Sequence, residues 1–143
     1  MSATEYLIDT NILIYHTKGL QITIDFISNL IAQHSFNISI LTKIEFPGWD
    51  KHTPDGFEKC KRLIELANTY PVDENIANKA IELRRKINIK LADAVIAATA
   101  IMHNLKLATR NTDDFKGIEE IEIIDPLETI GTGSTDLSLP SEG

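Results

Sequence analysis

Apolar positions along the chain alternate between short runs and longer segments with helical spacing. The runs at 5–9, 36–40 and 105–109 are short, largely apolar and flanked by polar or turn-forming residues, which predicts buried strands. Shorter or mixed runs at 70–73 and 118–125 predict two more strands. Segments 22–34 and 57–68 carry apolar stripes typical of helices, and 74–86 is an expected helix with Asp73 as its N-cap. Segment 41–46 forms a short helix that Pro47 and Gly48 kink or end. This alternation predicts an α/β fold with a parallel sheet.

Segment 91–103 differs from the other expected helices, because it is apolar on nearly every side. Asp93 is its only charged residue. A helix of this kind is normally buried in the centre of a domain. Its alanines and Thr99 permit close packing against a sheet. We therefore expect a central helix that carries one isolated carboxylate.

The length of 143 residues predicts one domain at 1–127, followed by a disordered Gly/Ser-rich tail at 128–143. No apolar stretch reaches the roughly 18 residues that span a bilayer, and no secretory signal is evident at the N-terminus. The single cysteine, Cys60, excludes an internal disulfide and fits a reducing compartment. We expect a cytoplasmic protein with no membrane partner.

The net charge of −7 argues against general binding to nucleic acid. The charges are unevenly distributed, however. Between residues 83 and 116, seven basic residues outnumber three acidic ones, whereas 125–143 holds four acids and no lysine or arginine. A local phosphate-binding surface is therefore compatible with the sequence. The run Arg84–Lys86 either contacts phosphates or is a solvated helix end.

Acidic residues occur at several points where the expected strands end or helices begin. Asp9 follows the first strand, Glu45 lies one helical turn beyond the second, and Asp93 begins the buried helix. Asp113 and Asp114, with Asn111, follow the strand at 105–109. In an open parallel sheet, ligands bind beyond the carboxyl ends of the strands. These separate acids are therefore expected to meet at one end of the sheet.

Each acid also has a purely structural interpretation. Asp9 alone is better explained as a helix N-cap, Glu45 as a solvated helix residue, and Asp113 with Asp114 as turn chemistry. Asp93 could cap its own helix or interact with the helix dipole. Capping does not explain why the only charge of this helix faces the end of the sheet. A purely structural explanation of all four acidic positions would need four independent coincidences. We therefore favour a shared acidic pocket.

Several like charges in one pocket raise some pKa values or share a cation. Ligands that are all oxygen suit Mg²⁺ or Mn²⁺. The four histidines are scattered, with no spacing typical of a zinc site. A divalent ion of this kind suits phosphodiester hydrolysis, because it lowers the pKa of bound water and stabilises the leaving oxygen.

Four ordered segments resemble the PIN-domain family, specifically the VapC-like toxins of type II toxin–antitoxin systems. They are YLIDTNILIY at 6–15, LTKIEF at 41–46, LADAVIAATA at 91–100 and LATRNTDDF at 107–115. The resemblance runs from about residue 6 to 126. It implies a parallel sheet of about five strands with helices on both faces, an acidic pocket, and cleavage of RNA that depends on Mg²⁺ or Mn²⁺.

The resemblance also implies roles for individual residues. Asp9 and Asp93 are the expected metal ligands, and Glu45 is a ligand or positions the attacking water. Asp114 is preferred as the fourth catalytic acid, although Asn111 is the other candidate. Supporting residues that could hold carboxylates or the scissile phosphate are Thr10, Asn11 and Thr109, and Arg110 could contact backbone phosphates.

The partners implied by the resemblance are an RNA substrate, a cognate antitoxin and a second copy of the chain in a homodimer. Segment 45–57 departs from the family, because its prolines and glycine bend the chain. Trp49 in this segment could stack on a base, enter a partner interface or fill a satellite core. Two other functions remain open: a catalytically inactive PIN-like binding protein, and a flavodoxin-like receiver module with a phosphorylated aspartate.

Overall fold

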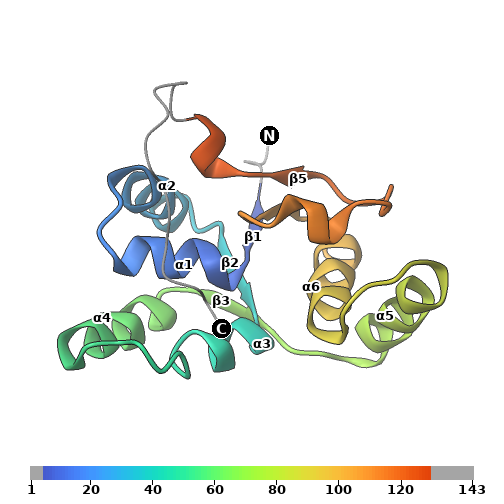
Figure 1. Ribbon diagram of the computed structural model, residues 1–143, viewed down its shortest axis with the longest axis horizontal. Coiled ribbons are helices and arrows are strands. Elements are labelled where there is room, and N and C mark those ends of the chain that lie inside the picture. The colour runs from blue at the N-terminus through green and yellow to red at the C-terminus, as the bar shows by residue number, and fades with distance from the viewer. Residues whose placement is uncertain (1–4, 130–143) are drawn as a thin grey trace.

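A computed structural model describes residues 5–129 of the chain. Its centre is a sheet of five strands, and every neighbouring pair is parallel (Figure 1). The strands lie in the order β3-β2-β1-β4-β5. Their bounds are β1 (Tyr6–Ile8), β2 (Phe36–Ser39), β3 (Asn68–Tyr70), β4 (Lys106–Ala108) and β5 (Ile123–Ile124).

Six α-helices and two short 3₁₀ helices connect and cover the strands. Polar side chains cap several of them: Asp9, Ser39, Thr53 and Asp73 each accept a backbone N–H at the start of a helix. The bounds are α1 (Thr10–Thr17), α2 (Gln21–Ala32), α3 (Ile40–Glu45), α4 (Pro54–Glu65), α5 (Glu74–Lys86), α6 (Leu91–Met102), η1 (Thr112–Phe115) and η2 (Pro126–Thr129).

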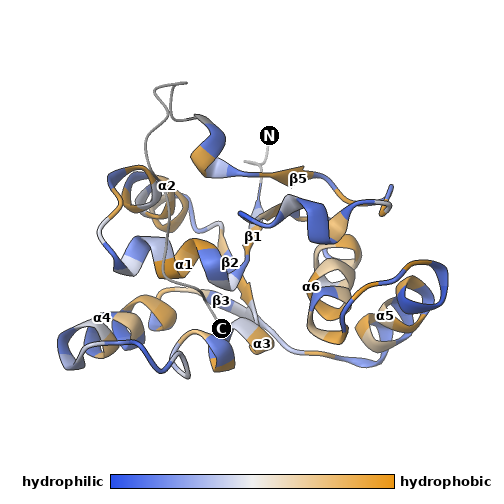
Figure 2. Cartoon of the chain, in the orientation of Figure 1, coloured by the Kyte–Doolittle hydropathy of each residue, from blue (hydrophilic) through white to orange (hydrophobic). Residues whose placement is uncertain are grey.

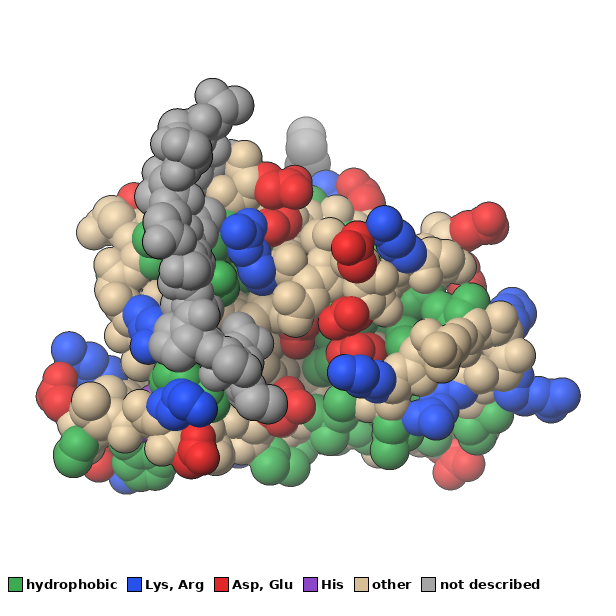
Figure 3. Space-filling model, in the orientation of Figure 1, with side chains coloured by type: hydrophobic (Ala, Val, Ile, Leu, Met, Phe, Trp, Pro, Cys, Tyr) green, Lys and Arg blue, Asp and Glu red, His purple; other side chains and the backbone are tan. Residues whose placement is uncertain are grey.

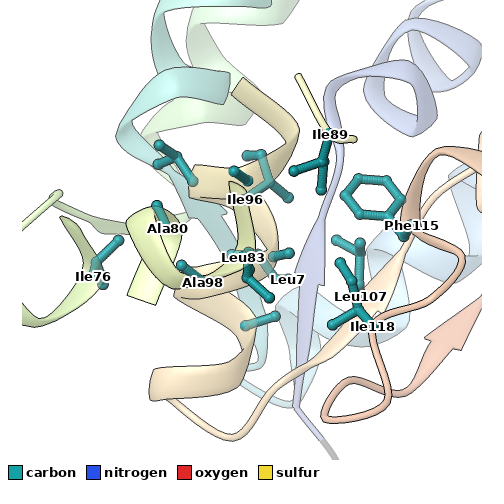
Figure 4. Close-up of a cluster of buried hydrophobic side chains, with 14 of the residues drawn as sticks. Leu7, Ile76, Ala80, Leu83, Ile89, Ile96, Ala98, Leu107, Phe115 and Ile118 are labelled. Carbon is teal, nitrogen blue, oxygen red and sulfur yellow. The ribbon is translucent and has the colours of Figure 1, made fainter. Parts of the chain in front are cut away.

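Two hydrophobic clusters lie on the two faces of the sheet. Leu7 belongs to the cluster under α5 and α6, and Ile8 to the cluster under α1, α2 and α4, because successive side chains of a strand point to opposite faces. Figure 4 shows the first cluster, where Leu7, Leu107 and Phe115 face residues of α5 and α6. The predicted sheet with helices on both faces is therefore confirmed.

Helix α6 has the burial expected of a central helix. Every residue from Ala94 to Ala100 is buried, and the helix is coloured mostly as hydrophobic in Figure 2. Its small side chains permit close contact with α5, which packs beside it (Figure 1). This packing fixes the first turn of α6, and with it Asp93, relative to the sheet.

Two predicted strands differ from the observed ones. The strand expected at 70–73 is β3 at 68–70, because Pro71 has no N–H for the ladder and Val72 is 41% exposed. The strand expected at 118–125 shrinks to β5, which pairs only with Leu107 and Ala108 of the three-residue β4. The tail predicted from 128 lies outside the described residues from 130 onward, and 128–129 belong to η2.

The strand order decides between the α/β folds that the sequence left open. A flavodoxin-like receiver has the order 2-1-3-4-5. The observed order places β1 between β2 and β4, so the receiver alternative is wrong. The order changes direction between β1 and β4, and ligands of such sheets bind beyond the strand ends at that point. In the described part of the chain, no helix has the length and apolar character needed to cross a membrane.

Candidate functional site

A cavity of about 630 Å³ lies where the chain leaves β1 and β4. The four acids singled out in the sequence all line it, together with Thr10, Asn11 and Asn111. They come from four segments: Asp9 after β1, Glu45 at the end of α3, Asp93 in α6 and Asp114 in η1. Figure 3 shows acidic and basic side chains gathered on this face, between the two groups of helices. The expected convergence of the acids is observed.

Asp9 is buried at the cavity wall and held by three donors. Its Oδ1 accepts the backbone N–H of Thr10 at 2.9 Å, so the residue does cap α1. Its Oδ2 accepts the hydroxyl of Thr109 at 2.8 Å and the amide of Asn11 at 3.4 Å. Burial raises the pKa of Asp9 from 3.8 to about 6, the charges of Asp93 and Glu45 add to the rise, and the hydrogen bonds oppose it.

Glu45 is exposed but anchored. Its Oε1 accepts the hydroxyl of Thr10 at 2.7 Å, which ties the end of α3 to the start of α1. The hydroxyl oxygen of Thr10 lies 3.1 Å from that of Thr42, a buried residue of α3. A glutamate that is simply solvated would not make this hydrogen bond, so the solvated interpretation of Glu45 is incomplete. Thr10 thus holds the carboxylate of Glu45 towards the cavity.

Asp93 lies half-buried in the first turn of α6. Lys90 occupies the cap position of this helix, so capping does not account for Asp93. Burial is the largest cause that raises its pKa, followed by the charge of Asp114, while Lys90 lowers it and Glu45 raises it. Asp93 therefore interacts electrostatically with acids from two other segments.

The loop after β4 holds Asp9 through Thr109, and further hydrogen bonds fix the loop itself. The hydroxyl of Thr109 also accepts the backbone N–H of Asn111 at 3.0 Å, and the backbone N–H of Arg110 donates to Oδ1 of Asn11 at 3.0 Å. The guanidinium of Arg110 lies 2.8 Å from Oδ2 of the buried Asp125. That ion pair was missed in the sequence, where Asp125 is simply the last residue of an expected strand.

Asn111 and Asp114 are both exposed residues of the cavity lining. Asp114 raises the pKa of Asp93, so it is electrostatically coupled to the other acids. Asn111 contributes a neutral amide. The preference for Asp114 as the fourth acid stays a prediction, with this coupling in its favour.

Three charged residues of the lining had no individual role assigned from the sequence: Asp50, Lys51 and Lys90. Lysines are usually solvated, and no pattern in the sequence marks these two. The run Arg84–Lys86 lies at the exposed end of α5 and is not part of the cavity lining. Its proposed contact with phosphate stays a prediction.

The donor chemistry of the cavity fits a hard divalent cation. All four acids supply oxygen. Burial first, and then the charges of neighbouring acids, raise the pKa of Asp9 and Asp93, and a cation relieves that repulsion. Among residues 5–129, no three His, Cys, Asp or Glu side chains are close enough together to hold an ion. Mg²⁺ commonly uses one or two carboxylates, with waters and phosphate oxygens as the other ligands. The carboxylates of this cavity fit a Mg²⁺ ion that is held by one or two of them and completes its shell with waters and phosphate oxygens.

Comparisons with known proteins agree with this geometry. The PIN domain family model matches residues 6–121. Ribonuclease VapC10 of Mycobacterium tuberculosis is 30% identical over 121 residues, which cover 81% of this chain and 90% of that protein. A toxin–antitoxin complex from Klebsiella pneumoniae contains a similar chain, with 31% identity, a TM-score of 0.68, and coverage of 85% of this chain and 98% of that one.

DNA-bound VapBC from Salmonella typhimurium has the same fold. Its TM-score is 0.75 at 20% identity, and the match covers 87% of this chain and 99% of that one. The family match spans most of the chain, including all four acids of the cavity. This chain therefore belongs to the PIN-domain family, and its relatives include VapC ribonucleases.

Proposed function

We propose that this protein is a VapC-like toxin: an endoribonuclease that requires Mg²⁺ or Mn²⁺ and hydrolyses phosphodiester bonds of RNA. The observation that carries the proposal is the meeting of four acids, from four separate segments, in one cavity at the switch point of the sheet. The similarity to ribonuclease VapC10 supports the same reaction. If the cavity had a structural role alone, the repulsion between its acidic side chains would destabilise the fold without serving any function.

Asp9 and Asp93 would hold the ion, and Glu45 would be a further ligand or orient the attacking water. A bound divalent ion supplies an activated water and neutralises charge that develops on the phosphate. Thr109 and Asn11 keep the carboxylate of Asp9 in one orientation. Supporting contacts of this kind fix ligand geometry and commonly change metal affinity by 10–100-fold.

Glu45 is suited to a role different from that of Asp9. It is exposed, and its Oε1 is anchored by Thr10. An exposed, oriented carboxylate can accept a hydrogen bond or a proton from a water that attacks the phosphate. Burial keeps Asp9 from that exchange with solvent. We therefore assign ligation to Asp9 and orientation of water to Glu45.

Single-stranded or looped RNA is the proposed substrate, because an unpaired backbone can enter a recessed cavity more easily than a duplex. Lys51 and Lys90 line the same cavity and can contact the phosphates.

The toxin role implies a cognate antitoxin, as in the complex from Klebsiella pneumoniae. An arginine or lysine of the antitoxin could inhibit the enzyme by entering the acidic cluster. A homodimer and a cytoplasmic location are further expectations.

The test is cleavage of mixed single-stranded RNA by the purified chain, with EDTA and after Mg²⁺ or Mn²⁺ is restored. We expect cut products only with the metal, and loss of at least about 100-fold in rate for Asp93→Asn. Asp114→Asn should also lose activity. Asp113→Asn is the matched control, because Asp113 neighbours Asp114 but pairs with Lys116 at 3.0 Å and is not part of the cavity lining.

Two outcomes would contradict the proposal. Cleavage that persists in EDTA, or unchanged activity in Asp93→Asn, would remove the acidic cavity from the reaction. A folded wild-type chain that cuts no RNA with either metal would favour the catalytically inactive binding protein. Asn111→Ala in the same assay decides between Asn111 and Asp114 as the fourth residue.

A further inference from the structure

Trp49 lines the same cavity as the four acids, from the turn that follows α3. It is the only tryptophan of the chain. Gly48 makes this turn possible: a Cβ at Gly48 would lie 2.8 Å from the carbonyl oxygen of Ile44, closer than real Cβ atoms approach backbone. The turn therefore folds back tightly on α3 and holds the indole at the cavity wall.

The indole of Trp49 is half-buried and packs against the hydrophobic cluster under α1, α2 and α4. His52 contacts the ring edge-on, with centroids 5.1 Å apart, and the ammonium of Lys18 lies 5.3 Å from the ring centroid. The indole Nε1 is buried and has no hydrogen-bond partner among the described residues. A buried donor without an acceptor costs free energy, and a phenylalanine would fill an apolar position without that cost. Packing therefore accounts for an aromatic ring at this position but not for the indole nitrogen.

The cavity wall carries both carboxylates and lysines, which are the groups that a metal ion and the phosphates of a nucleotide need. The acids lie at the ends of β1 and α3 and at the starts of α6 and η1. Lys51 and Lys90 also line the cavity, and Lys18 stands over the indole. Within residues 5–129, the ammonium of Lys51 pairs only with Asp50, at 4.0 Å, so it remains able to bind a phosphate. Carboxylates for a metal, cations for phosphates and an aromatic surface thus occur in one cavity.

We propose that Trp49 forms a nucleobase subsite, on which a base of single-stranded RNA next to the cleaved phosphate stacks. This inference rests on the proposed ribonuclease function. Stacking on an aromatic side chain tolerates any base, because every base has a π face. When the base stacks, Lys18 leaves its position over the ring and, together with Lys51, neutralises phosphates flanking the base. The subsite orients the strand so that the phosphate enters the acidic end of the cavity.

The fluorescence of the single tryptophan tests this subsite directly. The full chain is titrated in EDTA, so that no RNA is cut, with three probes: a short oligoribonucleotide, a sugar-phosphate strand of equal length without bases, and inorganic phosphate. We expect saturable quenching by the oligoribonucleotide and almost none by the other two. Equal quenching by the strand without bases would overturn the proposal, because phosphates alone would then explain the signal. Absence of quenching by any probe would overturn it as well.

Variants supply a second, kinetic measurement. Trp49→Leu should raise KM for RNA about tenfold, which is the size expected for loss of one stacked base, with little change in kcat. Trp49→Phe should recover most of the loss because it retains a ring. Phe57→Leu is the matched control: Phe57 belongs to the same aromatic group, 6.2 Å from His52, but is not part of the cavity lining. Thermal unfolding of each variant shows whether it is folded.

Failure of the subsite can be told apart from failure of the proposed function. If Trp49→Leu folds and keeps the KM of the wild type, the subsite is wrong while the nuclease stands. If the chain cuts no RNA but its fluorescence is quenched only by strands with bases, the subsite stands and the nuclease does not. The wild-type titration needs no variant, so it remains decisive even if Trp49→Leu does not fold.

Discussion

At the scale of single residues, Asp9 shows how one side chain combines a structural and a chemical role. Its Oδ1 caps α1, while its Oδ2 faces Thr109 and Asn11. Capping was the better interpretation of Asp9 alone, and the cap is present. The cavity adds burial and two neighbouring negative charges, which the capping role does not require. The structure therefore accommodates both roles because the two oxygens have different partners.

The raised pKa of Asp9 makes a prediction for the metal-free protein. The pKa is about 6 in the folded chain against 3.8 as the ordinary value. A raised pKa contributes stability that is complete below pH 3.8 and is lost as the pH rises through 6. Measured in EDTA, Asp9→Asn should gain up to about 3 kcal/mol in unfolding free energy relative to wild type between pH 4 and 7.

Denaturant unfolding at several pH values measures this difference. Asp113→Asn is the control, because it removes one exposed carboxylate outside the cavity lining. Parallel pH profiles for wild type and Asp9→Asn would show that Asp9 is ionised at its ordinary pKa in the folded chain.

At the scale of elements, the ion pair between Arg110 and Asp125 connects two segments that flank the site. Asp125 is buried and also accepts the backbone N–H of Leu127 at 2.9 Å, at the start of η2. Arg110 sits between Thr109 and Asn111, both of which belong to the site. The pair therefore joins the loop after β4 to the segment after β5, two neighbouring strands of the sheet. The pair uses Nη1 of Arg110, so a contact of Arg110 with phosphate would have to use the other N–H groups of the guanidinium.

Removing one partner of this pair should destabilise the fold. Asp125→Ala leaves a partly buried guanidinium without its carboxylate, and we expect a loss of about 2 kcal/mol in unfolding free energy. This is below the roughly 3–5 kcal/mol typical of fully buried pairs, because the side chain of Arg110 is 29% exposed. Asp113→Ala breaks the exposed pair with Lys116 and should cost less than about 1 kcal/mol. Equal losses in the two variants would contradict the structural role of Asp125.

At the scale of the whole molecule, the protein is acidic overall but carries basic residues at the cavity. The net charge of −7 repels a polyanion, yet the cavity has lysines at its wall. RNA must therefore bind through a few local contacts and not through the overall field. Lys18, Lys51 and Lys90 are the cations that lie in or beside the cavity. The number of phosphates they neutralise determines how strongly salt weakens binding.

The salt dependence of RNA binding follows from that count. Three contacts to a single strand give a slope of about −2 for log affinity against log salt, since each contributes about 0.7. Lys51→Gln should reduce the slope by about 0.7. Lys59→Gln is the control, because Lys59 pairs with Asp55 on α4 at 3.2 Å and is not part of the cavity lining. Binding to a labelled oligoribonucleotide in EDTA measures both; a steep slope unchanged in Lys51→Gln would place the RNA elsewhere.

Much of the fold could be predicted from local patterns along the chain. The Asp73 cap predicted α5 at its observed bounds, and the apolar content of 91–103 predicted the buried helix. These features depend on residues within a few turns of each other. The bounds of β3 and β5 were wrong because a strand extends only as far as its neighbour pairs with it, and that length is set by segments far away in sequence.

The candidate site could likewise be predicted from the sequence only in part. The sequence by itself determined which acids are present and that they follow strands or begin helices, since turn and capping chemistry is local. Only the tertiary structure decided that Thr10 would hold Glu45, that Arg110 would pair with Asp125, and that Lys51 and Lys90 would share the cavity with the acids. Such contacts join residues far apart in the chain, 35 positions for Thr10 with Glu45 and 100 for Thr109 with Asp9, and depend on how the helices pack against the sheet. Periodicity along a chain carries no information about that packing geometry.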